Sequence, residues 1–304
     1  MAAVTLRAPT IGDAEEIARV LNAHALASSG DATDTAAGVV EWFDYADLDP
    51  EQDMRVAVDA SSRITGYADI ADDGGLGTVF LIDVRADPDQ PDSSGELLDA
   101  MEARARAQAR PGAVARLFIG EHEEAFRALA TERGYGVVRS SYRMLIELDP
   151  APPVAEWPAG ITLRRYRAVD EDRVYEAHME AFTGQWGFTR VPQERWRSWN
   201  LGAQSDPSLW GIAWDGDEVA GVCINRPERG EGVGWVGVLA VREPWRRRGL
   251  GRALLLDAFA TFGAAGRQRA GLGVDAENVT GAVRLYESVG MTAASRSDTW
   301  ERVL

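Results

Sequence analysis

The sequence predicts a duplicated α/β protein, in which two consecutive domains each form a mixed sheet with helices on both faces. Three observations support this fold class: a Pro-rich segment near the middle of the chain, residues that recur at a long offset, and the order of the strand and helix patterns. In each copy, adjacent strand patterns come first and alternating strand and helix patterns follow, which is typical of such sheets.

The Pro-rich segment is 149–160, which holds four Pro in twelve residues. Such a stretch continues neither a helix nor a central strand, because Pro lacks the backbone N–H donor. We therefore expect a linker here, between one domain at 1–148 and a second at 161–304.

The repeat has an offset of about 156 residues. Each match is weak alone, but several matches in register over the whole length favour a duplicated domain over a short-period solenoid. The matching residues are Val4-Thr-Leu-Arg7 with Ile161-Thr-Leu-Arg164, Val56-Ala-Val-Asp59 with Ile212-Ala-Trp-Asp215, Gly66 with Gly221, Gly95 with Gly251, and Gly134 with Gly290.

The first copy opens with a short strand around Thr5 and an amphipathic helix over 13–25, for which Asp13 is a suitable N-cap. Alternating apolar residues predict the later strands, and a period of about 3.6 predicts the later helices. In chain order, these are strands 54–59, 64–70 and 77–84, helix 95–109, strand 114–119, helix 123–133 and strand 137–147.

The second copy repeats the same order of patterns. The repetition supports each assignment, because a strand or helix in one copy predicts its counterpart in the other. The expected elements are strand 161–166, helix 170–182, strands 208–214, 217–224 and 234–241, helix 249–264, strand 269–274, helix 279–289 and strand 293–302.

The net charge is −16, and all 32 basic residues are Arg. A nucleic-acid-binding protein usually carries a basic surface that neutralises phosphates, so this charge argues against a nucleic-acid partner. The excess is uneven: residues 1–150 hold 13 Arg and 28 acidic residues, whereas residues 151–304 hold 19 Arg and 20 acidic residues. This asymmetry indicates two domains with different roles.

Cys223 is the single cysteine, which excludes an intramolecular disulfide and thiolate zinc sites, and we expect no metal. The N-terminal residues lack the charged and apolar regions of a signal peptide, and no apolar run is long enough to span a bilayer. We therefore expect a cytoplasmic protein without a membrane partner, either a monomer or a homodimer.

The most informative stretch runs from Val238 to Arg252, where a strand is followed by three Arg and then by Gly249-Leu-Gly251 at the start of a helix. Glycines let backbone N–H groups approach a ligand, and the helix N-terminus adds positive partial charge. This pattern predicts an anion site suited to a pyrophosphate, although a solvated basic turn has the same pattern.

This stretch resembles the acyl-CoA signature of the GCN5-related N-acetyltransferases, a Leu-Ala-Val strand followed by Arg/Gln-x-x-Gly-x-Gly/Ala. Here it reads Leu239-Ala-Val241 and Arg246-x-x-Gly249-x-Gly251, and a second family element follows at Asn278-x-x-x-Ala282-x-x-Leu-Tyr-Glu-Ser-Val-Gly290. The resemblance covers 161–304 well and, through the repeat, 1–148 more faintly. It implies a mostly antiparallel sheet in each domain and acetyl-CoA as co-substrate.

The resemblance also implies roles for particular residues. Tyr286 would be the general acid that protonates the departing thiolate, unless it packs as an ordinary helix tyrosine. Asn278 would contact CoA, unless it only caps a helix. The remaining residues expected to bind the co-substrate are Leu239, Ala240, Val241, Arg246, Arg247, Arg248, Gly249, Leu250, Gly251 and Arg252.

The acceptor side is less well defined by the sequence. The family places the amine near the first helices and the strand that leads into Leu239, although a Trp-rich set is as typical of a core. Glu231 is the best candidate for a general base, with Glu180 behind it, and a water relay is the alternative. The expected acceptor residues are Phe182, Gln185, Trp186, Asn225 and Trp235.

In the first copy, the loop that matches the Arg-rich turn carries three Asp, which would repel a pyrophosphate. Ala130 stands where Tyr286 stands in the second copy and cannot donate a proton. We therefore expect a degenerate first domain. The other counterparts of the signature residues are Gln90 for Arg246, Ser93 for Gly249 and His122 for Asn278.

These observations predict a tandem N-acetyltransferase whose second domain transfers an acetyl group to a primary amine of a small molecule by direct attack. The two-domain layout resembles that of mycothiol synthases, and acetylation of a cysteinyl pseudodisaccharide is therefore an alternative. That family usually carries a Glu where this sequence has Trp235. A non-catalytic module that responds to CoA is a further alternative.

Overall fold

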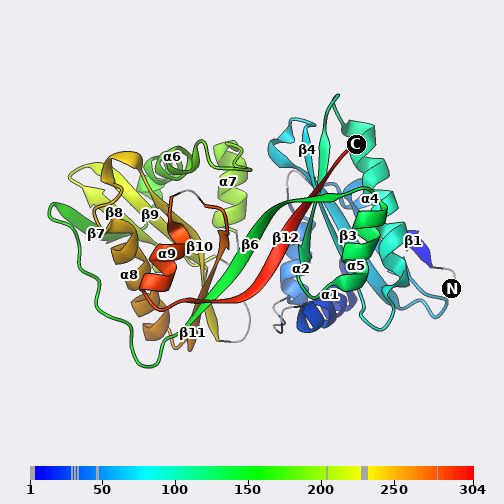
Figure 1. The fold of residues 1–304 in the computed structure, drawn as a ribbon, viewed down its shortest axis with the longest axis horizontal. Coiled ribbons are helices and arrows are strands. Elements are labelled where there is room, and N and C mark those ends of the chain that lie inside the picture. The colour runs from blue at the N-terminus through cyan, green and yellow to red at the C-terminus, as the bar shows by residue number, and fades with distance from the viewer. Residues whose placement is uncertain are drawn as a thin grey trace. The chain divides into compact units, whose positions relative to one another are not determined.

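The computed structural model describes residues 4–28, 30, 32, 34–45, 48–202, 205–226, 232–278 and 280–304. The chain divides into two compact units: Met1–Ser141 with Ser295–Leu304, and Tyr142–Ala294 (Figure 1). We describe each unit by itself.

The first unit is a sheet in which β4 and β5 are parallel, whereas β1 with β2, β2 with β3, β3 with β4, and β5 with β12 are antiparallel. Its strands, in spatial order, are β1 (Thr5–Arg7), β2 (Met54–Val58), β3 (Ile64–Asp72), β4 (Val79–Ala86), β5 (Val114–Gly120) and β12 (Thr292–Val303). One face packs against α1 (Ala14–Ser28) and α2 (Ala36–Trp42), and the other against α4 (Ser94–Gln108) and α5 (Glu124–Glu132). A short helix, α3 (Pro50–Asp53), precedes β2.

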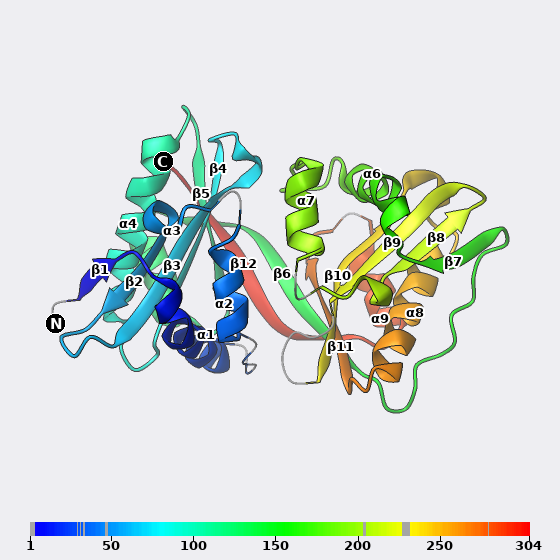
Figure 2. The ribbon, with the colours of Figure 1, turned by 180° about the vertical axis from the view of Figure 1, so that it is seen from behind.

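The second unit repeats this arrangement, with β10 and β11 as its parallel pair (Figure 2). Its strands, in spatial order, are β6 (Gly136–Glu147), β11 (Arg269–Asp275), β10 (Val233–Val241), β9 (Glu218–Arg226), β8 (Gly211–Asp215) and β7 (Ile161–Arg165). The helices α8 (Leu250–Ala264) and α9 (Ala282–Ser288) cover one face. The helices α6 (Glu171–Phe182) and α7 (Gln193–Asn200) cover the other.

Each face of the second sheet has a separate apolar core. On the α8 face, Phe262 packs so closely that a Cβ atom at Gly234 would come within 2.3 Å of its ring, so only glycine fits there. On the α6 face, Trp196, Trp210 and Trp214 are all at most 1% exposed and belong to the core. Large aromatic side chains contribute much of the burial energy in such cores.

The last strand of each copy spans both units rather than staying in its own. Residues 297–303 of β12 pair with β5, and Trp300 lies in the core of the first unit. In the second unit, Met144 and Leu148, from the end of β6 and just beyond it, pack into the core on the α8 face. The last residues of the chain thus complete the first unit.

The predicted fold class is confirmed: each unit is a mixed, mostly antiparallel sheet with helices on both faces. Three helices were not predicted, α2, α3 and α7, because all are short and bury only Val39, Asp53 and Trp196, respectively. The compact units also differ from the segments 1–148 and 161–304, since residues 295–304 belong to the first unit.

Candidate active site

The site begins where β10 separates from β11. The two strands stay paired only as far as Val236, and Gly237 lies at a bulge in the pairing with β9. Beyond the bulge, the Arg242 N–H donates to a carbonyl of β9 at 3.1 Å. Because backbone groups alternate along a strand, the N–H and C=O groups of Leu239 and Val241 point away from β9, toward the gap beside β11.

The chain then turns through a 3-10 segment, Glu243–Trp245, into α8. Arg247 has a φ of 58° and Gly249 a φ of 84°, so this turn visits the left-handed region twice. Gly249 is the N-cap of α8 and offers no side-chain cap. The first N–H groups of a helix have no partner within it, so they are available to an anion, which the helix dipole also attracts.

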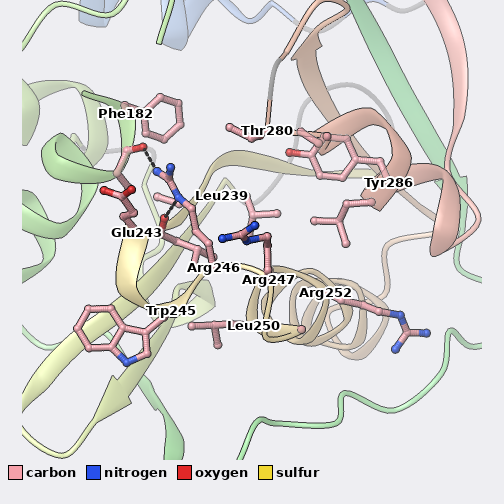
Figure 3. Close-up of a pocket in the computed structure, with 18 of the residues that line it drawn as sticks. Phe182, Leu239, Glu243, Trp245, Arg246, Arg247, Leu250, Arg252, Thr280 and Tyr286 are labelled. Atoms are coloured by element: carbon pink, nitrogen blue, oxygen red, sulfur yellow. Dashed lines mark hydrogen bonds between the residues drawn. The ribbon is translucent and has the colours of Figure 1, made fainter. Parts of the chain in front are cut away.

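A cavity of about 620 Å³ opens at this turn, within the range of about 300–1,000 Å³ that is usual for small-molecule sites. Its walls come from β10, the turn, α8, the end of α6 and the start of α9 (Figure 3). The lining residues are Ala181, Phe182, Gln185, Leu239, Ala240, Val241, Glu243, Trp245, Arg246, Arg247, Gly249, Leu250, Gly251, Arg252, Thr280, Gly281, Ala282, Leu285 and Tyr286.

The three arginines of the turn and Arg252 of α8 differ in their surroundings. Arg247 and Arg252 line the cavity, whereas the exposed Arg248 does not. Arg246 also lines the cavity, but its guanidinium donates to two backbone carbonyls, those of Val241 at 2.9 Å and Ala181 at 2.8 Å. Arg247 and Arg252 are therefore better placed than Arg248 to supply positive charge to a ligand.

Tyr286 reaches the cavity from α9, and Figure 3 shows its ring extending toward Thr280. The side chain is 7% exposed, and burial, with a smaller effect of the nearby Cys223, raises the pKa of its phenol to about 12. The phenol is therefore protonated at neutral pH and can donate a proton. Burial also raises the pKa of the Cys223 thiol, so this cysteine is not a thiolate nucleophile.

Asn278 does not line the cavity. Its side-chain oxygen accepts from the backbone N–H of Thr280 at 2.8 Å and from the Thr280 hydroxyl, which closes the turn before α9. This arrangement places Thr280 and Gly281 in the cavity wall. In the structure, Asn278 therefore shapes the wall rather than facing the cavity.

The residues expected to bind the acceptor amine fall into two groups. Phe182 and Gln185 line the cavity at the end of α6. The Phe182 ring also lies edge-on against His178, with 5.1 Å between the ring centroids. Burial lowers the pKa of His178 to about 4, so this histidine is neutral at pH 7 and accepts a bond from the Trp196 indole at 2.9 Å.

The other expected acceptor residues lie outside the cavity wall. Asn225 is 1% exposed and donates to the Leu209 carbonyl at 2.8 Å, which makes it part of the buried framework. Trp235 is 7% exposed, and Trp186 is 43% exposed. Glu231, the expected base, lies outside the described residues. Glu180 binds Arg242 at 2.7 Å and does not line the cavity.

The sequence did not point to several residues of the cavity wall. Some lie within or next to the signature elements, and helix periodicity alone could have suggested Ala282, which lies four residues before Tyr286 and shares a face with it. Nothing local marks the contribution of Ala181. The residues that were missed are Ala181, Glu243, Trp245, Thr280, Gly281, Ala282 and Leu285.

Comparisons with known proteins agree with this geometry. Residues 171–291 match the acetyltransferase (GNAT) family. A curated relative, the mycothiol acetyltransferase of Geodermatophilus obscurus, is 31% identical over 57% of this chain and 59% of its own length. The crystal structure of a GCN5-related N-acetyltransferase from Sphaerobacter thermophilus has a TM-score of 0.80 and 30% identity, with 99% of this chain and 95% of that chain covered.

A tandem GNAT protein from the clavulanic acid biosynthesis pathway shares the fold over 99% of this chain and 98% of its own, with a TM-score of 0.77 and 15% identity. Fold and family together define the class, a protein built from two consecutive GNAT domains. The chain belongs to the GCN5-related N-acetyltransferase family, and it is similar to the mycothiol acetyltransferases within it.

Among the described residues, no helix is both long enough and apolar enough to cross a bilayer. The same residues contain no group of three or more His, Cys, Asp or Glu side chains that could hold a metal ion.

Proposed function

We propose that this protein transfers the acetyl group of acetyl-CoA to a primary amine of a small molecule, in the cavity of its second unit. One observation carries the proposal: a single cavity joins an uncapped helix N-terminus, a strand with outward-facing backbone groups and a buried, protonated tyrosine. A thioester donor needs all three, for its phosphates, its amide-bearing arm and its leaving group.

The cavity suits the parts of acetyl-CoA in order. The pyrophosphate fits the N-terminus of α8, where Arg247 and Arg252 add charge. The pantetheine amides fit the backbone groups of Leu239 and Val241, in the gap beside β11. Apolar side chains at Leu250 and Leu285 complete the wall around the arm.

The reaction needs no covalent enzyme intermediate. A neutral amine attacks the thioester carbonyl, a C–N bond forms, and the C–S bond breaks. The Tyr286 phenol protonates the departing sulfur, and solvent then reprotonates the phenolate. The excess proton on the amine goes to a base, for which Glu231 and a water relay are our candidates from the sequence.

The name of the Geodermatophilus relative, mycothiol acetyltransferase, favours the narrower alternative that the resemblance implied, acetylation of a cysteinyl pseudodisaccharide. Trp235 is the main argument against it, because the resemblance implies that mycothiol synthases usually carry a Glu at this position. In this chain the Trp235 ring packs beside Gly271 and under the guanidinium of Arg143 at 5.9 Å. We therefore keep both acceptors, small primary amines in general and the cysteinyl pseudodisaccharide in particular.

We further propose that acetyl-CoA binds only the second unit. In the first unit, Ser93 stands at the N-cap of α4 where the second unit has Gly249, and a buried Asp87 lies in the preceding loop. Asp87 binds Arg19 at 2.8 Å and Arg63 at 3.3 Å, so these two arginines are already paired with a carboxylate. Ala130, the counterpart of Tyr286, is fully buried in the core.

The test is a screen of amines with the purified protein and acetyl-CoA, in which released thiol is measured, together with calorimetric titration of CoA. We expect turnover with at least one small primary amine and one CoA site per chain. Two sites would contradict our account of the first unit. CoA binding without turnover of any amine, cysteinyl pseudodisaccharide included, would favour a non-catalytic CoA-responsive module.

A further inference from the structure

Arg246 occupies the first position of the CoA signature, yet its guanidinium is bonded to the protein itself. Nε donates to the Val241 carbonyl at the end of β10, and one terminal nitrogen donates to the Ala181 carbonyl in the last turn of α6 (Figure 3). The second of these bonds joins the turn to a helix residue that lies 65 residues earlier in the chain.

The Ala181 carbonyl belongs to a helix end that needs donors. The last carbonyls of a helix have no partners within it, and a cation is favourable at this end of the dipole. Gln185 donates its side-chain amide to the same Ala181 carbonyl at 3.2 Å. Arg246 and Gln185 therefore share one acceptor, and Phe182 and Gln185 form the cavity wall beside it.

A second arginine strengthens the same connection. Arg242, just before the turn, donates to the Glu180 carboxylate at 2.7 Å and to the Val219 carbonyl at 3.0 Å. Its guanidinium also lies over the Trp245 ring at 5.0 Å. The end of α6 is thus held from both sides of the Glu243–Trp245 segment.

We propose that Arg246 is a positioning residue, which fixes the acceptor wall of Phe182 and Gln185 to the phosphate turn rather than binding the pyrophosphate. The inference rests on the proposed function. A pyrophosphate that orders the turn also orders the donor for Ala181, so binding of the acyl donor prepares the wall against which the amine is held. Arg246 acts through hydrogen bonds, and its charge toward the ligand is secondary.

Three substitutions separate hydrogen bonding from charge. Arg246→Gln keeps an amide donor and loses the charge, Arg246→Lys keeps the charge and loses the planar fork, and Arg246→Met loses both. We expect the specificity constant kcat/KM for the amine to fall about 10- to 100-fold in the Met variant, with Gln retaining more activity than Lys. The Kd for CoA should change less than about threefold in the Gln and Met variants.

The matched comparison is Arg247→Gln, which removes a cavity-lining charge and should weaken CoA binding about tenfold. Arg284→Gln, on the exposed side of α9 and outside the cavity, should leave both activity and CoA affinity unchanged. If Lys restores activity better than Gln, or if Arg246→Gln weakens CoA as much as Arg247→Gln, Arg246 binds the phosphates and the proposal fails.

A readout without turnover keeps this test separate from the proposed function. Amide hydrogen exchange of the segment 179–188 should slow when CoA binds the unmodified protein. The slowing should be lost in Arg246→Met, although that variant still binds CoA. Equal protection in both proteins would overturn the proposal even if no amine substrate is found, whereas the expected exchange result without turnover would leave only the catalytic proposal in doubt.

Discussion

Among single residues, Tyr286 gives the clearest prediction. Its phenol is buried and its pKa is raised to about 12, so the proton-donating form persists across the whole pH range in which the protein would be assayed. We expect Tyr286→Phe to lower kcat about 10²- to 10⁴-fold, the range for a positioned general acid. Stopped assays of released thiol, with calorimetry for acetyl-CoA affinity, would measure both quantities.

The same pKa predicts a pH profile. Because Tyr286 loses its proton only above about pH 12, its deprotonation should produce no fall in rate between pH 7 and pH 10. An unchanged kcat in Tyr286→Phe would mean that another group, or water, protonates the thiolate. A decrease in acetyl-CoA affinity equal to the decrease in rate would assign Tyr286 to binding instead.

The second residue prediction concerns Arg247, which lines the cavity and has a φ of 58°. Among uncharged residues other than glycine, Asn tolerates this backbone region best, so Arg247→Asn removes the charge with little added strain. We expect the Kd for CoA to rise about 10-fold or more, and its dependence on salt to weaken. Arg248→Asn should have a smaller effect, since Arg248 is outside the cavity lining, and calorimetry at two salt concentrations would compare them.

At the scale of elements, α8 contains its own control. Gly249 at its N-cap has a φ of 84°, whereas Gly263 in its last turn has no such requirement and open space around its Cβ position. We expect Gly249→Ala to destabilise the protein by about 1–2 kcal/mol and to weaken CoA binding, because the N–H groups of the turn lose their direction. Gly263→Ala should be neutral or stabilising, by up to about 1 kcal/mol.

Thermal unfolding and CoA titration of both variants would check this prediction. Equal destabilisation by the two alanines would show that the left-handed backbone at Gly249 is not what the turn requires. Unchanged CoA affinity in Gly249→Ala would show that the backbone of this turn does not contribute to CoA binding.

The elements also show what sequence patterns can supply. The strand and helix pattern located β10, the turn and α8, because Leu239-Ala-Val241 and the glycines are local signals. The direction of the Arg246 guanidinium has no local signal, since a side chain aimed at a phosphate and one aimed at Ala181 have the same sequence. Asn278 is a similar case, because an asparagine that closes a turn with Thr280 and one that binds a ligand have the same local sequence.

At the scale of the whole molecule, β12 lies beside β5 of the first copy and β6 lies beside β11 of the second, so the last strands of the two copies are exchanged. The sequence could not predict this exchange, for a different reason. β6 and β12 are each the last strand of their own copy, and both contain twelve residues. When equivalent strands change places, each sheet keeps the same kinds of contact, so the apolar pattern of the chain is unaltered. Trp300 belongs to the second copy in sequence, yet it packs in the core of the first unit, and no local pattern marks that partner.

The charge asymmetry of the chain predicts different pH responses for its two units. In the first unit, Asp69 on β3 lies directly opposite Asp83 on β4, and Arg85 pairs with Asp83 at 2.7 Å. His24 and Glu123, which both contact Arg85, bind each other at 3.2 Å. Burial, and then the charge of Asp83, raise the pKa of the Asp69 carboxyl to about 7, because like charges on facing positions repel.

The sign of the effect follows from proton binding. The unfolded chain releases the Asp69 proton near pH 4, whereas the folded unit keeps it until about pH 7, so stability should fall as pH rises between these values and then level off. We expect the free energy of unfolding to fall by roughly 1–3 kcal/mol between pH 4 and pH 8, less than the full pKa shift would give, because solvent screens the charges.

Asp69→Asn should remove most of this pH dependence and, at pH 8, stabilise the first unit. The exposed Asp44→Asn is the control, and hydrogen exchange in β3 and β4 during urea titration would report the first unit alone. A slope that persists in Asp69→Asn would place the titrating group elsewhere in the unit.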